Sequence, residues 1–263
     1  MIRKHILISL LVLGFVCNVF AVEEVKFEAN DKTQSGEQLV LTAKLRKPEG
    51  NGPFPAIVML HPCIEATREL DAWSERLVSW GYITLQVDSF KPRGVTCKPG
   101  EVTVESDEVL QSYQKRAQDA HDAKAYLVKT PHVNTNRIGL IGWGHGAWAL
   151  IGALSKYDYI KNRGDPFTAA VAYCPYTSKM LIDMDAPLLI LHAELDKPDG
   201  VDKLPRMIPS SETDHELIYH IYPGVDFGFD WEGFDGGGKA KYNPDVAEDA
   251  FRRTKEFFGK YLQ

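Results

Sequence analysis

The sequence predicts an α/β domain with a mostly parallel central sheet and helices on both faces. From residue 55 to the end, short apolar runs alternate with segments whose apolar residues have helical spacing. Unbroken apolar runs are typical of strands buried on both faces, and strand–helix alternation is typical of parallel sheets. No linker, repeat or low-complexity block divides residues 22–263, which predicts a single domain. In such folds, ligands bind beyond the carboxyl ends of the strands.

The apolar pattern also predicts where each element lies. Residues 25–27 and 39–44 alternate apolar and polar side chains on either side of Gly36, which indicates an antiparallel hairpin at the sheet edge. Buried strands are expected at 55–61 and 82–87, the central strand at 138–141, and further strands at 167–173, 187–191 and 216–222. Helices are expected at 71–80, 107–129, 145–154 and 246–261. Gly81 is expected to end the first helix, because glycine tolerates the left-handed backbone common there.

The first residues have the pattern of a secretory signal peptide. Arg3 and Lys4 precede an apolar run from Ile6 to Val16, and a small residue, Ala21, stands at the expected cleavage site. The run is too short to span a bilayer, and no later stretch reaches the roughly 18 to 20 apolar residues that a spanning helix needs. We therefore expect residues 1–21 to be removed and residues 22–263 to be exported, to the periplasm or the extracellular space.

Charge and cysteine content narrow the classes of partner. The whole chain has 30 basic and 36 acidic residues, and the leader contains two basic and no acidic ones, so the mature net charge is 28 − 36 = −8. An acidic chain without a Lys/Arg stripe argues against nucleic acid and anionic membrane as partners. A small molecule or a partner protein remains. The mature cysteines, Cys63, Cys97 and Cys174, lack paired metal-ligand spacing, so we expect no structural zinc and no cofactor.

Residues 136–148 have the pattern of a strand that turns sharply into a helix to present a catalytic nucleophile. Gly142 and Gly146 are spaced like the flanking glycines of the G-x-S-x-G motif. Gly144, however, stands at the central position where a serine or cysteine is expected. Because glycine has no atom that can attack a carbonyl, the motif is present without its nucleophile.

Several motifs in one order resemble the dienelactone hydrolase family of α/β-hydrolases. They are the segment 55–94, the run 136–148, the strand that leads to Asp196, the turn 222–224 and the helix with Ala250-Phe251-Arg252-Arg253. Cys63 after His61, the run 88–94 and Cys97 resemble a secreted branch of that family. The resemblance covers nearly all of the mature chain and implies the α/β-hydrolase fold for residues 22–263.

The resemblance also assigns the three positions of the catalytic triad. The nucleophile position falls on Gly144 and the acid position on Asp196, which is retained. The histidine position falls on Phe227, and no histidine occurs after His220. Triad members act as a unit, so the loss of the nucleophile and of the base predicts the loss of hydrolysis by this route.

The same resemblance places the backbone donors of the oxyanion hole at Cys63 and His145. Pro62 has no N–H group and Glu65 adds negative charge, and both disfavour anion binding in this loop. A disulfide between Cys63 and Cys97 would hold the loop to the segment after Asp88, and two buried thiols are the alternative.

The leading interpretation is an exported dienelactone hydrolase-like protein that keeps the fold and the crevice, lacks hydrolase chemistry, and binds a small molecule or a partner protein. The alternative is an active carboxylic-ester or lactone hydrolase that uses Cys174 or His145 with Asp196. His145 is expected to point away from the crevice, and the sequence shows no base beside Cys174. His192 is expected to be a packed histidine. A structural remnant without a ligand is the third interpretation.

The positions of three tryptophans in the chain predict whether they lie in the core or at the crevice. Trp143 and Trp148 flank the glycine turn and are expected in the core, whereas Trp231 is expected at the mouth of the crevice.

Overall fold

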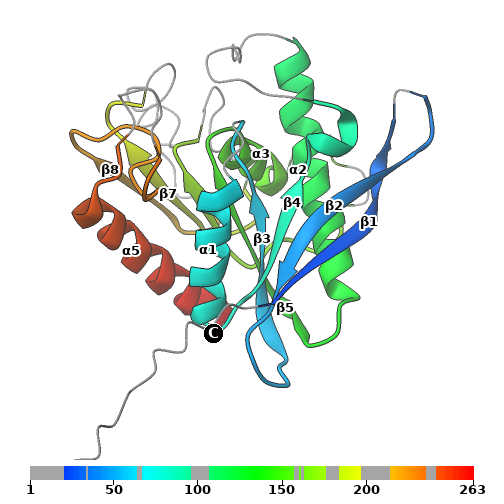
Figure 1. The fold of residues 1–263 in the computed structure, drawn as a ribbon, viewed down its shortest axis with the longest axis horizontal. Coiled ribbons are helices and arrows are strands. Elements are labelled where there is room, and N and C mark those ends of the chain that lie inside the picture. The colour runs from blue at the N-terminus through cyan, green and yellow to red at the C-terminus, as the bar shows by residue number, and fades with distance from the viewer. Residues whose placement is uncertain are drawn as a thin grey trace, which may run out of the picture.

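A single eight-stranded sheet forms the centre of the fold, as the computed structural model shows (Figure 1). Its strand order is β1-β2-β4-β3-β5-β6-β7-β8, and all neighbours from β4 to β8 pair in parallel. Strand β2 runs against both of its neighbours, so the sheet begins with an antiparallel hairpin at one edge. The strands are β1 (Val22–Lys32), β2 (Gln38–Arg46), β3 (Phe54–Leu60), β4 (Ile83–Asp88), β5 (Val133–Trp143), β6 (Ala170–Tyr173), β7 (Leu188–Ala193) and β8 (Leu217–Tyr222).

Helices cover both faces of this sheet. Helices α1 and α5 lie on one face and α2 and α3 on the other (Figure 1). Their bounds are α1 (Thr67–Ser79), the short 3₁₀ helix η1 (Lys91–Arg93), α2 (Asp107–Val128), α3 (His145–Leu154) and α5 (Pro244–Leu262). The Asn243 side chain accepts a hydrogen bond from the Val246 N–H group at the start of α5, and Pro244 occupies the first turn, where no donor is needed.

The structure describes residues 21–33, 35–63, 67–95, 107–156, 160, 163–175, 184–196, 214–234 and 241–263. The predicted signal peptide, apart from Ala21, therefore lies outside the described residues. The same holds for Cys97 and Glu65, so the Cys63–Cys97 pairing stays a prediction. No helix in the described part of the chain combines the length and hydropathy needed to cross a membrane.

The predicted α/β class, the parallel sheet and the edge hairpin are confirmed. Several strand bounds differ from the prediction, and β5 extends from the predicted 138–141 to Val133–Trp143. β1 extends well beyond residues 25–27, because an edge strand tolerates the polar side chains that follow them. β6 begins at Ala170 instead of residue 167, since the Thr168 hydroxyl bonds to the backbone of Asn136 and Ile138 at the strand entrance.

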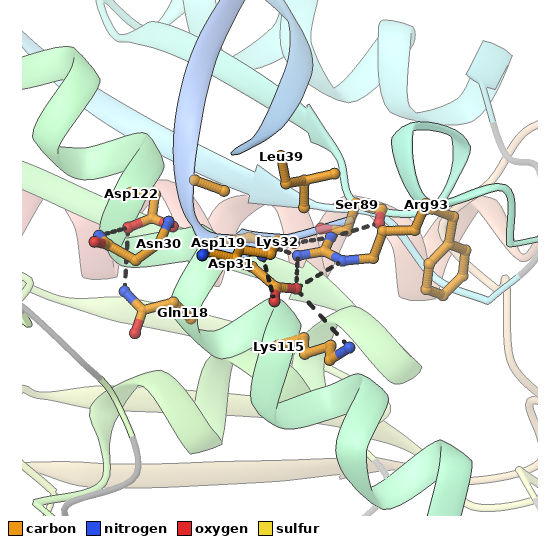
Figure 2. Close-up of polar contacts among 12 residues, drawn as sticks. Asn30, Asp31, Lys32, Leu39, Ser89, Arg93, Lys115, Gln118, Asp119 and Asp122 are labelled. Carbon is orange, nitrogen blue, oxygen red and sulfur yellow. Dashed lines mark hydrogen bonds and ion pairs between the residues drawn. The ribbon is translucent and has the colours of Figure 1, made fainter. Parts of the chain in front are cut away.

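A polar network ties the first strand to α2 and to η1 (Figure 2). The Arg93 guanidinium donates hydrogen bonds of 2.7 and 2.8 Å to the two carboxylate oxygens of Asp119 on α2, and lies 3.1 Å from Asp31 on β1. Beside this cluster, Asn30 donates its backbone and side-chain N–H groups to Asp122. Asp119 is fully buried, so the two-pronged bond from Arg93 compensates the burial of its carboxylate. The network holds the segment after β4 against the sheet.

The turn between β5 and α3 packs against the end of β3 with no room for side chains. A Cβ atom on Gly146 would lie 2.3 Å from the carbonyl oxygen of Leu60. One on Gly142 would lie 2.6 Å from the carbonyl oxygen of Gly146. Non-bonded carbon atoms in contact lie about 3.5 to 4.0 Å apart, so neither position has space for a methyl group. Close packing therefore requires both glycines of the predicted motif.

This packing predicts a large loss of stability for Gly146→Ala. We expect the substitution to lower the free energy of unfolding by at least about 3 kcal/mol, at the upper end of overpacking costs, because the new methyl group meets backbone that cannot move aside. Gly259→Ala is the matched control. Gly259 lies within α5, and the nearest atom to its Cβ would be 3.9 Å away. The added methyl group should therefore stabilise the protein by about 0.5 to 1 kcal/mol. Urea unfolding of both variants measures the difference, and equal stabilities would contradict the packing argument.

Candidate active site

The predicted nucleophile position, Gly144, lies at the apex of the turn between β5 and α3. Its backbone has φ 51° and ψ −115°, a conformation that residues with a side chain rarely adopt. Gly144 stands directly before the first residue of α3. A Cβ atom at Gly144 would lie 3.2 Å from Cε2 of Phe227 and 3.7 Å from Cβ of Pro62. The Phe227 ring therefore covers the apex from which a nucleophilic side chain would project. The two positions predicted to have lost their catalytic residues are in direct contact.

Buried contacts position the loop that carries Phe227. The Phe227 ring packs edge-on against Trp231, with ring centroids 5.0 Å apart. One carboxylate oxygen of Asp230 accepts hydrogen bonds from the indole N–H groups of Trp73 at 2.8 Å and of Trp143 at 3.2 Å. Burial raises the pKa of Asp230 to about 6. The expectation for Trp231 was wrong: it is buried, because Phe227 and Phe234 pack against it, and these two rings are themselves only partly buried.

The retained acid position, Asp196, follows β7 and is buried. Burial raises its pKa to about 7, and the nearby carboxylate of Asp226 acts in the same direction. The hydrogen-bond partner of its side chain is the thiol of Cys174, at the end of the neighbouring strand β6. The carboxyl group that would orient a histidine in a triad therefore contacts a cysteine here.

Cys174 has a base as a neighbour, which the sequence analysis did not find. The thiol, the His192 imidazole and the Asp196 carboxylate bring one ligand atom each to within 4.8 Å of one another. β6 and β7 pair in parallel with Tyr173 opposite Leu191, so Cys174 and His192 emerge side by side. Burial, followed by the charge of Asp196, raises the pKa of the Cys174 thiol well above its usual range. His192 is buried as expected.

His145, the first residue of α3, points to α2. Its Nδ1 atom accepts a hydrogen bond of 2.7 Å from the guanidinium of Arg116, and its ring packs against Phe90 and Trp148. Burial and the Arg116 charge keep the pKa of His145 well below its usual value. The side chain is thus turned away from the crevice, as expected, and its partner is Arg116. Of the two residues in the hydrolase alternative, Cys174 is the one that contacts Asp196.

Arg116 is the site residue that sequence reasoning missed. It is fully buried, donates a hydrogen bond to the carbonyl oxygen of His61, and places its guanidinium carbon 4.6 Å from the centroid of the Phe90 ring. Burial lowers the pKa of Arg116 to about 9. The signal available in the sequence was the position of Arg116 on the small-residue face of the helix predicted at 107–129. Arg116 links α2 both to the loop after β3 and to the start of α3.

Of the two predicted oxyanion donors, His145 directly follows Gly144, and Cys63 follows Pro62, whose Cβ atom would lie 3.7 Å from a Cβ atom at Gly144. The His145 N–H group opens α3 and so has no partner within the helix. Cys63 follows Pro62 in the loop after β3. His61, at the start of this loop, accepts a hydrogen bond from the Ser89 N–H group through Nε2 at 3.3 Å, which is a structural role. The loop and the helix start are thus held in place around the apex.

A parallel sheet covered on both faces, with a glycine turn between β5 and α3 at the carboxyl end of the central strands, defines an α/β-hydrolase fold. The dienelactone hydrolase family matches residues 41–262, so the chain belongs to the dienelactone hydrolase family. The predicted family and fold are confirmed.

Two kinds of relative resemble the chain. The "Putative carboxymethylenebutenolidase" of Synechocystis sp. is 21% identical over 244 residues, which cover 88% of this chain and 96% of the relative. Among solved structures, a dienelactone hydrolase-like promiscuous phosphotriesterase from metagenomic libraries has a TM-score of 0.71 at 15% identity, covering 92% of this chain and 100% of its own. Esterase 2 of Thermogutta terrifontis has a TM-score of 0.65 at 12% identity, with 91% and 94% covered. These structures show the shared fold.

The buried carboxyl group of Asp230 leads to a stability prediction. Asp230→Ala leaves two buried indole N–H groups without an acceptor, and we expect it to lower the free energy of unfolding by about 2 to 5 kcal/mol. Asp230→Asn keeps an acceptor oxygen, so it should stay within about 1 kcal/mol of the wild type. Thermal and urea unfolding at pH 7 compare the two variants. Equal losses would show that the indole bonds do not stabilise the loop.

The contact between Gly144 and Phe227 predicts coupling between these positions. Gly144→Ala should destabilise by about 1 to 3 kcal/mol through its backbone conformation and its contact with the ring. In the Phe227→Ala background the ring is absent, so the same substitution should cost less, with a coupling energy of about 0.5 to 3 kcal/mol. A double-mutant cycle of unfolding free energies measures this term. Additive losses would place the ring away from the apex.

Proposed function

We propose that this chain is an exported, non-hydrolytic member of the dienelactone hydrolase family that binds a small molecule or a partner protein in the crevice of the fold. The observation that carries this proposal is the Phe227 ring against Gly144. A ring now occupies the space above the apex, in the place of the hydroxyl or thiol and the imidazole that the family's reaction needs. The leader at residues 1–21 supports export.

The physical argument concerns which atoms remain for the reaction. Glycine offers no nucleophile, and phenylalanine can neither remove a proton nor donate one. Asp196 keeps the acid position, but its partner is the Cys174 thiol. The backbone N–H of His145 would still favour a partial negative charge at the apex. These features support binding in the crevice without cleavage.

The alternative is a hydrolase that attacks through Cys174. Its support is the cluster of Cys174, His192 and Asp196, which contains a thiol, an imidazole and a carboxyl group. Two observations oppose it. The thiol is buried, and its raised pKa disfavours the thiolate, which is the nucleophilic form. We therefore retain binding as the function that the geometry supports best.

A panel of short-chain aryl esters and lactones tests the proposal. We expect the wild type to give the same turnover as its Asp196→Ala variant, at the level of the buffer. Gly144→Ser combined with Phe227→His should raise turnover at least about tenfold, because it restores the nucleophile and the base beside the retained acid. Gly144→Ser alone is the matched control and should stay inactive. Robust wild-type turnover that Asp196→Ala or Cys174→Ser abolishes would refute the proposal.

A further inference from the structure

Three metal-ligating side chains meet at the carboxyl ends of β6 and β7. Cys174, His192 and Asp196 each offer one ligand atom, and these atoms all lie within 4.8 Å of one another. The residues are 2%, 1% and 9% exposed, respectively. Burying a thiol, an imidazole and a carboxyl group together is costly unless they bind one another or a ligand. Such a cluster has the composition of a transition-metal site.

The imidazole of His192 is oriented as metal ligands commonly are. Its Nδ1 atom lies 3.0 Å from the carbonyl oxygen of Ala193, and a carbonyl can only accept, so Nδ1 carries the proton. Nε2 then has a lone pair, and it is buried with no hydrogen bond of normal geometry among the described residues, although the backbone carbonyl of Pro175 also lies close enough to the ring to affect its pKa. Histidine ligands typically donate their other ring N–H to a carbonyl or carboxylate in this way. A cation would satisfy the buried acceptor at Nε2.

The backbone at Cys174 is held in an unfavourable conformation. Its φ is 47°, in the left-handed region that residues with a side chain seldom adopt. Its N–H group donates to the carbonyl oxygen of Leu191 at 2.9 Å, which fixes the conformation at the end of β6. Such strain is concentrated at ligand-binding and catalytic sites. Here it directs the thiol toward Asp196 and His192.

We propose that Cys174, His192 and Asp196 bind one divalent transition-metal ion of the zinc type. A thiolate, an imidazole and a carboxylate select zinc over magnesium or calcium, which prefer oxygen ligands alone. Three protein ligands leave the fourth tetrahedral position open to a ligand in the crevice.

The spacing of the three ligands along the sequence does not reveal this site. The ligands come from the ends of two neighbouring strands, so no short C-x-x-C or His-rich spacing reveals them. With Phe227 at the histidine position, Asp196 also has no triad role to perform. The proposed metal site depends on this geometry and does not require the proposed binding function.

Cobalt(II) titration tests the site, because cobalt replaces zinc and absorbs light. Reduced protein, made metal-free with a chelator, should bind one Co²⁺ per chain and show a thiolate-to-metal charge-transfer band together with intense tetrahedral d–d bands. Zn²⁺ should displace the cobalt and remove these bands. Cys174→Ser should abolish the charge-transfer band, and His192→Gln and Asp196→Asn should each weaken binding at least about tenfold. His220→Gln, a histidine on the neighbouring strand β8, is the control and should bind as the wild type does.

A second measurement keeps the test decisive if a variant fails to fold. In the wild type, one equivalent of Zn²⁺ should slow alkylation of Cys174 by iodoacetamide at least about tenfold, as followed by peptide mass mapping. Absence of stoichiometric cobalt binding, a charge-transfer band that persists in folded Cys174→Ser protein, or alkylation of Cys174 that zinc does not slow would each overturn the inference. Ester turnover is measured separately, so the metal site and the loss of hydrolysis can each fail alone.

Discussion

The close contact between the turn Gly142–Gly146 and the end of β3 is the constraint on which the rest of the site depends. Because a side chain at Gly146 would collide with the Leu60 carbonyl, only glycine allows α3 to begin so near the sheet. This contact fixes the direction of α3 and places Gly144 at the apex, between the loops that follow β3 and β8. The elements that surround the crevice are positioned relative to this turn, so the fold keeps the geometry of a nucleophile-bearing turn without the nucleophile.

Around this turn, the residues at the predicted nucleophile and histidine positions form a packed unit. The Phe227 ring lies over Gly144 and against Trp231, and the carboxyl group of Asp230 holds the loop to the indoles of the core. The large Phe227 ring thus fills the space beside Gly144, which has no side chain. A well-packed interior needs such complementarity, because an empty space beside a glycine would forfeit dispersion contacts. The packing explains how the fold remains intact while two triad positions differ from the family's pattern.

Two buried polar clusters flank the apex and have different chemistry. On the α2 side, Arg116 donates hydrogen bonds to the His145 ring and to the backbone of the loop after β3. These bonds hold both the ring and the loop in place. On the β7 side, Cys174, His192 and Asp196 face one another, with an imidazole nitrogen that has no hydrogen bond of normal geometry among the described residues. In the first cluster the two terminal nitrogens of Arg116 donate to neutral acceptors and its guanidinium lies over an aromatic ring, while its Nε has no hydrogen-bond partner among the described residues, and the cluster has a structural role. The second has an unfilled acceptor and a strained backbone, which are properties of a ligand site.

Local patterns in the sequence were sufficient to predict the order of the elements, the edge hairpin and the family. Apolar periodicity specifies strands and helices over short distances, and the glycines of the turn 142–146 identify themselves by spacing. The resemblance to the dienelactone hydrolase family placed Gly144 and Phe227 at the triad positions. Element ends were less predictable, as β1 and β6 show, because edge exposure and a side-chain hydrogen bond at Thr168 set them.

Contacts between distant residues were decided only by the tertiary structure. That the Phe227 ring lies on Gly144, that His192 lies beside Cys174, and that Arg116 binds His145 all depend on strand register and on the docking of helices on the sheet. A one-residue shift between β6 and β7 would turn Cys174 and His192 to opposite faces of the sheet. No short-range pattern in the sequence contains that information. The sequence alone therefore determined which residues stand at the predicted triad positions, and the packed structure determined which side chains lie against them.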